Sequence, residues 1–343
     1  MGMELRSRSF SAVVAAIGFG LLSVSCTPRP SGVLIGVAFP TQNQSRWATE
    51  EKILSARAAA NGDRVIVQYA NESAATQKNQ VETLLQRGVQ VLILTAIDPA
   101  AAGDLVRQAQ AQGVKVISYD RFVTGAKPDL NVGRDFVKVG ELQADAALAF
   151  APSGDYAMIR GDQSTLAQIE MSRAYDAKLK GRAGINIVHD SMIPGWETAA
   201  AQRQAEAALQ RSPNIKAFVV QWDNGAQAVV QAVKSAGLKP NTVFVSGNDA
   251  STPSLTYIAQ GWQTLSVWAP IDQMAETAAT AAHALGTSKT PPKANAEVAG
   301  VPTVYVPLIP VTKANLCEFI TRIAPKGWVT PREVFGSAPS PCG

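Results

Sequence analysis

Aspartate, arginine and tryptophan residues recur directly after short apolar runs along this chain. Carboxylates and guanidinium groups make paired, charge-assisted hydrogen bonds to neighbouring hydroxyls, and an indole face can cover the apolar C–H face of a sugar ring. A site that combines these groups could hold a neutral polyol without reacting with it. The candidates are Arg46, Trp47, Asp120, Arg121, Asp135, Trp196, Trp222, Asp223 and Asp249.

Each candidate also has a purely structural interpretation. An Asp at the end of a strand often only caps the following helix, and this applies to Asp135 and Asp223. Asp120 and Arg121 are adjacent and could form a local ion pair. The tryptophans could equally be ordinary core residues, and these are Trp47, Trp196 and Trp222.

Motifs of the common enzyme classes are missing from the sequence. The two histidines, His189 and His283, fall on different predicted elements, so a histidine-based metal site is not expected. No nucleophile elbow, phosphate-binding loop, dinucleotide fingerprint or calcium loop occurs. Two aspartates of the site could act as acid and base on a glycosidic bond, which is the enzyme alternative. Because the motifs of the common enzyme classes are missing, we expect a binding protein without cofactor or metal.

The elements that must position these residues alternate regularly. Short apolar strands at residues 33–39, 65–69, 91–94 and 114–119 are separated by amphipathic helical stretches, and the rhythm resumes after residue 133. Continuous apolar strands between helices indicate parallel sheets that are covered on both faces. The sequence thus predicts an α/β fold of two Rossmann-like, doubly wound lobes. Ligands of such sheets bind outside the carboxyl ends of the strands, where the candidates lie.

The N-terminal segment predicts export. Arg6 and Arg8 precede an apolar run at residues 10–22, which is typical of a signal peptide over residues 1–25. Cys26 could then become the lipidated first residue of a tether over 26–32, or an ordinary signal peptidase could leave it as a free thiol. Exported proteins tend to pair their cysteines; with Cys26 lipidated, Cys317 and Cys342 remain to form a disulfide.

The net charge is +4, and the lysines and arginines are scattered along the chain. Nucleic-acid binding is therefore not expected.

Several motifs between residues 33 and 308 resemble the type I sugar-binding proteins of bacterial ABC transporters, most closely the xylose-binding branch. They are Ser45-Arg46-Trp47, Thr76-Gln77, the run from Val116 to Arg121, the run from Val139 to Ala144, Pro194-Gly195-Trp196 and the run from Ser246 to Ala250. The resemblance implies that Arg46, Asp120, Arg121 and Asp249 contact the ligand and that Trp47 and Trp196 enclose its ring. It places Asp135 and Gln168 near further polar positions.

The resemblance also implies three chain crossings, near Gly133-Arg134, Ala269-Pro270 and Gly300-Pro302. One lobe would hold residues 33–133 and 270–300, and the other 134–269 and 301–343. A monomeric, lipid-anchored protein in the periplasm, or on the outer face of the cytoplasmic membrane, would deliver a sugar or small polyol to an ABC permease. The alternative is a subunit that presents its ligand to a chemotaxis or two-component sensor.

Two departures from the branch bear on specificity. Trp222-Asp223 stands where the xylose binders have Asn-Asp. Val267-Trp268-Ala269-Pro270 stands where they have a Val-Tyr-Lys-Pro run, so Ala269 replaces a lysine. Two polar contacts are lost, so D-xylose is expected to bind weakly. A smaller, deoxygenated or linear polyol is expected to bind better, unless Gln168 or Asn248 replaces the lost donors.

Overall fold

The computed structural model describes residues 1–2, 32–42, 45–336 and 341–342. Residues 3–31, which hold Cys26 and nearly all of the predicted signal peptide and tether, lie outside the described residues. No helix in the described ranges combines the length and the apolar character that crossing a bilayer requires.

The first lobe is built on a sheet with the strand order β11-β12-β5-β4-β3-β1-β2. Its strands are β1 (Leu34–Phe39), β2 (Arg64–Tyr69), β3 (Val91–Leu94), β4 (Lys115–Tyr119), β5 (Leu130–Gly133), β11 (Ala296–Val298) and β12 (Val301–Tyr305). Apart from the antiparallel pair β11 and β12, neighbouring strands are parallel. Every residue of β3 is buried, as expected for a strand covered on both faces.

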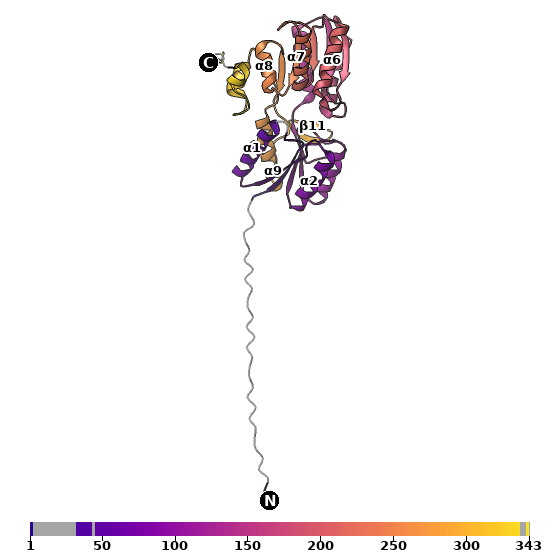
Figure 1. Ribbon diagram of the computed structural model, residues 1–343. Helices are drawn as coiled ribbons and strands as arrows, with labels where there is room; N and C mark the ends of the chain where they lie inside the picture. The colour runs from indigo at the N-terminus through magenta and orange to yellow at the C-terminus, as the bar shows by residue number, and fades with distance from the viewer. Residues whose placement is uncertain (3–31, 43–44, 337–340, 343) are drawn as a thin grey trace. The chain divides into compact units, whose positions relative to one another are not determined.

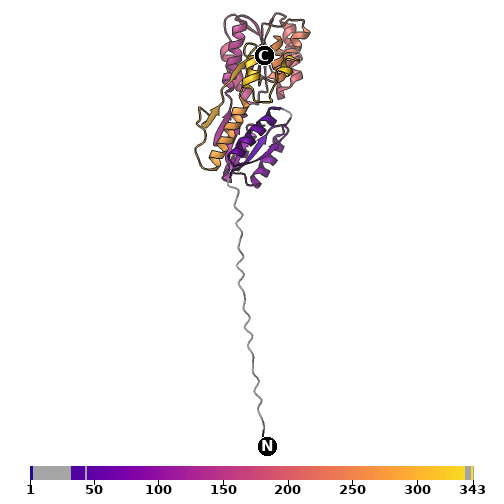
Figure 2. The same cartoon turned by 90° about the vertical axis from the view of Figure 1, so that its left-hand side faces the viewer.

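Helices cover both faces of this sheet. Helix α1 (Ser45–Ala60) and helix α9 (Ile271–Gly286) share one apolar cluster with β1, and they lie side by side in Figure 1. Helix α2 (Ala74–Gln86) and helix α3 (Ala101–Ala111) cover the other face. Because α9 follows α1 by more than 200 residues, the chain must return to this lobe, and Figure 2 shows the orange helix α9 beside the indigo part of the chain.

The second lobe has the strand order β13-β10-β9-β8-β6-β7. Its strands are β6 (Gly154–Arg160), β7 (Ile185–Met192), β8 (Ala217–Val220), β9 (Phe244–Asn248), β10 (Leu265–Trp268) and β13 (Ile309–Val311), the last antiparallel to β10. Helices α4 (Phe136–Phe150) and α5 (Leu166–Leu179) cover one face, and α6 (Thr198–Arg211) and α7 (Asp223–Ser235) cover the other. Helix α8 (Thr252–Gln260) follows β9. The predicted architecture of two α/β lobes is confirmed.

The predicted third crossing, near Gly300-Pro302, is wrong. Strand β12 pairs in parallel with β5 of the first lobe, and Asn131 Nδ2 donates a hydrogen bond of 3.1 Å to Thr303 Oγ1. Ala299 and Gly300 both have positive φ, 52° and 74°, which is the backbone of a tight hairpin between β11 and β12. Gly300 therefore marks a hairpin turn, and residues 301–305 belong to the first lobe. The chain crosses to β13 at residues 306–308.

A C-terminal segment closes the outer side of the second lobe. It contains α10 (Leu316–Glu318), a π-helical turn at Phe319–Ile323 and α11 (Pro331–Phe335). The ring of Trp268 lies 5.5 Å from Phe319 and 5.0 Å from Trp328, between centroids, and only 1% of Trp268 is exposed. Cys317 and Cys342 are joined by a disulfide that closes this segment on itself.

Removing that disulfide should loosen the C-terminal segment. The bridge spans a sequence separation of 25 residues, for which loop-closure entropy gives a stabilisation of about 3 kcal/mol. We expect the double substitution Cys317→Ser and Cys342→Ser to lower the thermal midpoint and to expose residues 325–336 to proteolysis. Cys26→Ser, which leaves the bridge intact, is the control. Peptide mapping of unreduced protein should recover Cys317 and Cys342 in one linked pair, and two free thiols would reject the bridge.

Candidate functional site

A network of charged side chains joins the carboxyl ends of the two sheets; Arg46, Asp120 and Arg134 are buried, and the Asp249 side chain is 38% exposed. Asp120 follows β4, Arg134 follows β5, and Arg46 lies in the first turn of α1. Arg134 donates to Asp120 Oδ1 from Nε and Nη2 at 3.1 and 3.0 Å, and Arg46 Nη2 lies 3.3 Å from the same oxygen. From the second lobe, Asp249 Oδ1 accepts from Arg134 Nη1 at 2.5 Å. Arg134 thus binds a carboxylate of each lobe.

Backbone geometry directs both carboxylates into this network. Asp120 has φ of 59° and Asp249 has φ of 100°, in the left-handed region that side chains other than glycine rarely adopt. The strain is held by the sheets, because Asp120 N–H donates to Val132 O and Asp249 N–H donates to Val267 O, both at 2.9 Å. Strained backbone that the fold maintains is a common feature of functional sites.

Asp120 remains ionised although only 4% of the residue is exposed. Burial alone would raise its pKa, but the positive charges of Arg134, Arg46 and Arg121 lower the pKa to about 2. Asp120, Arg46 and Arg134 thus form a compensated set of buried charges that solvent does little to screen.

Glu50, which was not among the predicted site residues, completes the charge balance around Arg46. Its carboxylate accepts from Arg46 Nε at 2.7 Å and from the Tyr119 hydroxyl, and none of the residue is exposed. Burial raises the pKa of Glu50 above its ordinary value, against the opposing effect of Arg46. The spacing of four residues between Arg46 and Glu50 on one helix was the sequence signal for this pair.

Two tryptophans face each other at the strand ends of the second lobe. The rings of Trp196 and Trp222 meet edge to face, with centroids 5.3 Å apart and an interplanar angle of 82°. Gly161 makes room for Trp196, because a Cβ at that position would lie 1.9 Å from the indole ring. Trp222 is 8% exposed, and its Nε1–H has no hydrogen-bond partner among the described residues.

Three other predicted site residues make contacts that stabilise the fold. Asp135 caps helix α4 by accepting from Lys138 N–H at 2.9 Å. Gln168 is buried on α5 and donates to Ser172 Oγ at 3.0 Å. Trp47 is 1% exposed and packs in the first lobe's core against Phe39, with the Arg46 guanidinium 4.3 Å from its ring centroid.

Asp223 and Arg121 also lie beside the network. Asp223 accepts hydrogen bonds from Ser251 N–H and Oγ and from Ser266 Oγ, and so ties the start of α7 to the loop after β9. Burial, followed by the charge of Asp249, raises its pKa to about 7. Arg121 is bound to Glu72 at 3.0 Å, on the same lobe, and its side chain is 29% exposed.

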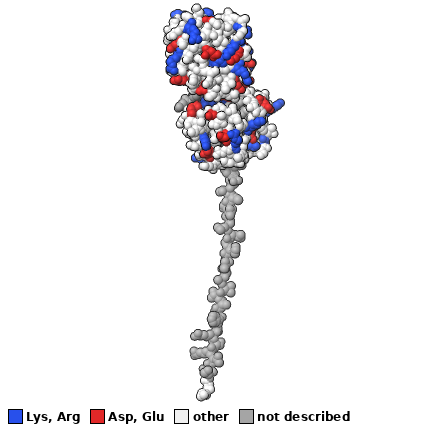
Figure 3. All heavy atoms as spheres, turned by 90° about the vertical axis from the view of Figure 1, so that its right-hand side faces the viewer, with Lys and Arg blue, Asp and Glu red and all other residues white. Residues whose placement is uncertain are grey.

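The described residues contain no group of three or more His, Cys, Asp or Glu side chains arranged to hold a metal ion. On the face drawn in Figure 3, acidic and basic side chains are interspersed. The network of Arg46, Asp120, Arg134 and Asp249 is therefore the place where the structure brings predicted polar site residues together.

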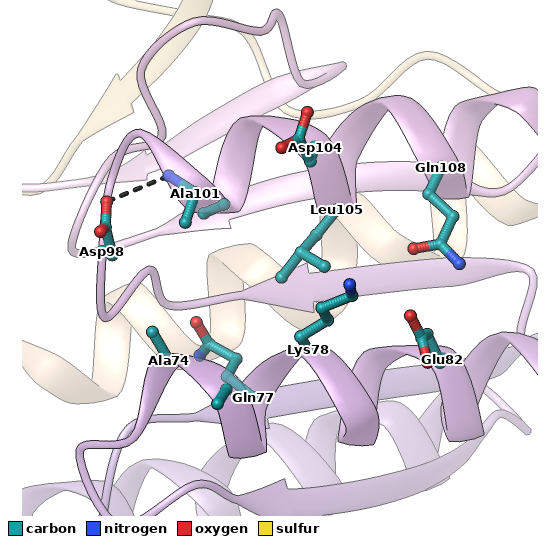
Figure 4. Close-up of a pocket in the computed structure, with 11 residues that line it drawn as sticks. Ala74, Gln77, Lys78, Glu82, Asp98, Ala101, Asp104, Leu105 and Gln108 are labelled. Atoms are coloured by element: carbon teal, nitrogen blue, oxygen red, sulfur yellow. Dashed lines mark hydrogen bonds between the residues drawn. The ribbon is translucent and has the colours of Figure 1, made fainter.

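A separate groove of about 550 Å³ lies between α2 and α3 on the first lobe (Figure 4). Lys78 and Glu82 line it from α2, and Asp104 and Gln108 line it from α3. Asp98 at its end accepts from the Ala101 N–H and so helps to start α3. Neither Asp120 nor Arg134 lines this groove, so it is distinct from the charge network.

Comparison with known proteins gives consistent matches over most of the chain. The sequence profile of the family described as periplasmic binding protein domain matches residues 35–290. The D-xylose-binding periplasmic protein of Escherichia coli is 32% identical over 88% of this chain and 93% of its own length, and that of Haemophilus influenzae is 29% identical over 91% and 96%. An ABC transporter solute-binding protein from Clostridium phytofermentans with bound β-D-glucose superposes with a TM-score of 0.79, at 20% identity, over 88% of this chain and 99% of its own.

The pKa of Asp120 predicts how stability depends on pH. Because the folded pKa, about 2, is lower than the value of about 3.9 in unfolded chains, ionised Asp120 stabilises the fold above about pH 4 and loses this effect as the pH falls toward 2. Asp120→Asn should cost about 2–3 kcal/mol at pH 7 and flatten the acid limb of urea unfolding.

Asp145→Asn is the control for that measurement, because Asp145 is 55% exposed and forms a surface pair with Lys178. Its free energy of unfolding should stay within about 0.5 kcal/mol of wild type. An Asp120→Asn protein with an unchanged acid limb would contradict the assignment of an ionised, stabilising Asp120.

Proposed function

Because the chain belongs to the periplasmic binding protein family, whose members are solute-binding proteins and not enzymes, we propose that it captures a neutral monosaccharide or small polyol between its two lobes. The observation that carries the proposal is the pair of carboxylates, Asp120 and Asp249, that opposite lobes contribute to one network. A ligand that bonds both would hold the lobes together, which is how hinged lobes convert binding into closure.

Each of these carboxylates has capacity left for a ligand. All hydrogen bonds from described residues to their side chains reach Oδ1, from Arg134 to both and from Asn248 to Asp249. The Oδ2 atoms are therefore available as acceptors for hydroxyl groups. Asn248 Oδ1 is enclosed without a described partner, which supports a further hydroxyl contact at the end of β9.

The charge balance supports a neutral ligand. Arg46 and Arg134 face Asp120, Asp249 and Glu50 within hydrogen-bond or ion-pair distance. No unpaired guanidinium of this network is left to attract an anion. A polyol, whose hydroxyls both donate and accept, fits such a balanced set better than a charged solute does.

The ligand we propose is xylose-like, and two substitutions shape the choice. Trp222 places an indole N–H at the end of β8, where an Asn would offer both a donor and an acceptor. Ala269, which is buried, stands at the lysine position of the xylose binders and supplies no polar group to the site. Relatives with bound or named D-xylose and β-D-glucose make both sugars suitable probes.

We further propose that the ligand is delivered to an ABC permease, and that export leaves the protein in the periplasm, attached through lipid on Cys26. The D-xylose-binding relatives of Escherichia coli and Haemophilus influenzae are named as periplasmic proteins, which supports the compartment. A subunit that presents its ligand to a membrane sensor would use the same lobes. Sugar uptake by cells that lack the protein distinguishes the two, because loss of uptake supports delivery and an unchanged uptake supports sensing.

Calorimetric titration with D-xylose, D-glucose, myo-inositol and xylitol tests the specificity. We expect D-xylose to bind more weakly than the best polyol of the panel, because a buried hydroxyl without a partner costs about 1–3 kcal/mol, or about one to two decades in affinity. D-xylose binding as tight as any other would show that Trp222 is compensated. If none of the four compounds binds, the proposed function is wrong.

Trp222→Phe tests the indole N–H directly. The substitution keeps an aromatic ring against Trp196 and removes the unpartnered Nε1–H. If that group donates to a ligand hydroxyl, affinity should fall about tenfold. Trp262→Phe, in the same lobe but packed beside Lys234, is the matched control and should leave affinity unchanged. Equal affinity of the two variants would contradict a role for the Trp222 N–H.

A further inference from the structure

We propose that Arg134 is a positioning residue that couples lobe closure to the ligand site: its guanidinium forms an inter-lobe ion bridge, Asp120–Arg134–Asp249, which holds the lobes together before a ligand binds. The expected effect on ligand binding rests on the proposed function, whereas the expected effect on the free protein does not. The sequence predicts Arg134 only as part of a chain crossing and gives its neighbour Asp135 as a candidate ligand contact.

Position makes this arginine suited to the role. Arg134 directly follows Gly133, the last residue of β5, and so lies in the first chain connection between the lobes. Its side chain is 2% exposed, and its guanidinium lies 5.6 Å from the ring centroid of Phe136. A side chain enclosed in this way has few alternative conformations, so the geometry of its hydrogen bonds is fixed.

The division of its donors is the central observation. Nε and Nη2 bind Asp120 of the first lobe, whereas Nη1 binds Asp249 of the second. A planar fork can serve two carboxylates in this way, and a lysine, with one nitrogen, cannot reproduce it. Arg46 makes only a longer contact with Asp249, at 3.9 Å, so it replaces the inter-lobe bond poorly.

The bridge also fixes which carboxylate atoms a ligand meets. Because Arg134 binds Oδ1 of both Asp120 and Asp249, it orients both Oδ2 atoms and leaves them for hydroxyls. A ligand then adds its hydrogen bonds to a partly assembled site. When the competent conformation is already populated, less of the binding free energy is used to reach it, and the apparent affinity rises.

The first test uses the protein without ligand. Arg134→Gln should increase the radius of gyration measured by small-angle scattering, after any co-purified solute has been removed by unfolding and refolding without reductant. Arg160→Gln is the matched control, since Arg160 is equally buried and binds Asp176 and Asp190, but all within the second lobe. It should leave the radius of gyration unchanged.

A second variant keeps the test decisive if Arg134→Gln does not fold. Asp249→Asn preserves the Asp120 half of the bridge and weakens only the inter-lobe half, so it should expand the free protein as well. An unchanged radius of gyration in a folded variant, or an equal expansion in Arg160→Gln, would overturn the proposal. Because no ligand is present, these outcomes do not depend on whether a sugar binds.

Binding kinetics with the tightest polyol of the titration panel supply the second readout. Arg134→Gln should weaken binding about 5- to 150-fold, the usual range of coupling between sites. The loss should lie in faster dissociation, while association is equal or faster because the free lobes are more open. Arg134→Lys should recover less than half of the loss on a logarithmic scale. Slower association with unchanged dissociation, or full recovery by lysine, would contradict a bridge that depends on the guanidinium fork.

Discussion

The strand ends of the first lobe depend on one requirement: a carboxylate that is removed from water must be compensated by positive charge. An uncompensated buried charge is very costly, and a buried pair is tolerated only when hydrogen bonds satisfy it. Asp120 meets the requirement with Arg46 and Arg134, and Arg46 in turn requires Glu50. Asp120 and Arg134 follow the neighbouring strands β4 and β5, and Arg46 and Glu50 lie one turn apart on α1. The order of strands in the sheet therefore decides which charges can meet.

Charge compensation extends from the first lobe to the second. Arg134 has donors beyond those that Asp120 occupies, and the structure directs one of them to Asp249. Apart from Asp249, which also lies 3.9 Å from Arg46, the ion pairs of the second lobe's described residues stay within that lobe, as in the buried Arg160 with Asp176 and Asp190. Its contribution to the site is mainly aromatic and amide groups, from Trp196, Trp222 and Asn248. The two lobes thus differ in chemistry although their five-stranded parallel cores, β2-β1-β3-β4-β5 and β7-β6-β8-β9-β10, have the same strand order.

The fold could be predicted from the sequence because continuous apolar strands and amphipathic helices alternate, and that pattern reflects local burial. The third crossing could not, since Gly300 serves equally in a hairpin and in a connection, and only the pairing of β12 with β5 distinguishes them. The sequence gives Asp120 and Asp249 as candidates because they follow strands, and in the structure both carboxylates bind Arg134. Trp47 lies in the core and Asp135 caps a helix. A sequence pattern locates the end of a strand but not the direction of the side chains there, so it does not single out Arg134 as a member of the site.

The pairing of β12 with β5 also sets the order in which the chain can fold. Asn131 and Thr303, which bond across this pair, are 172 positions apart. A chain that emerges from its N-terminus therefore exposes one edge of β5 until nearly the whole second lobe has appeared. Such non-local pairing is slow, and an unpaired strand edge is a template for pairing with other chains. The first lobe begins earliest, but its sheet is complete only when β12 appears, after β6, β7, β8, β9 and β10 of the second lobe.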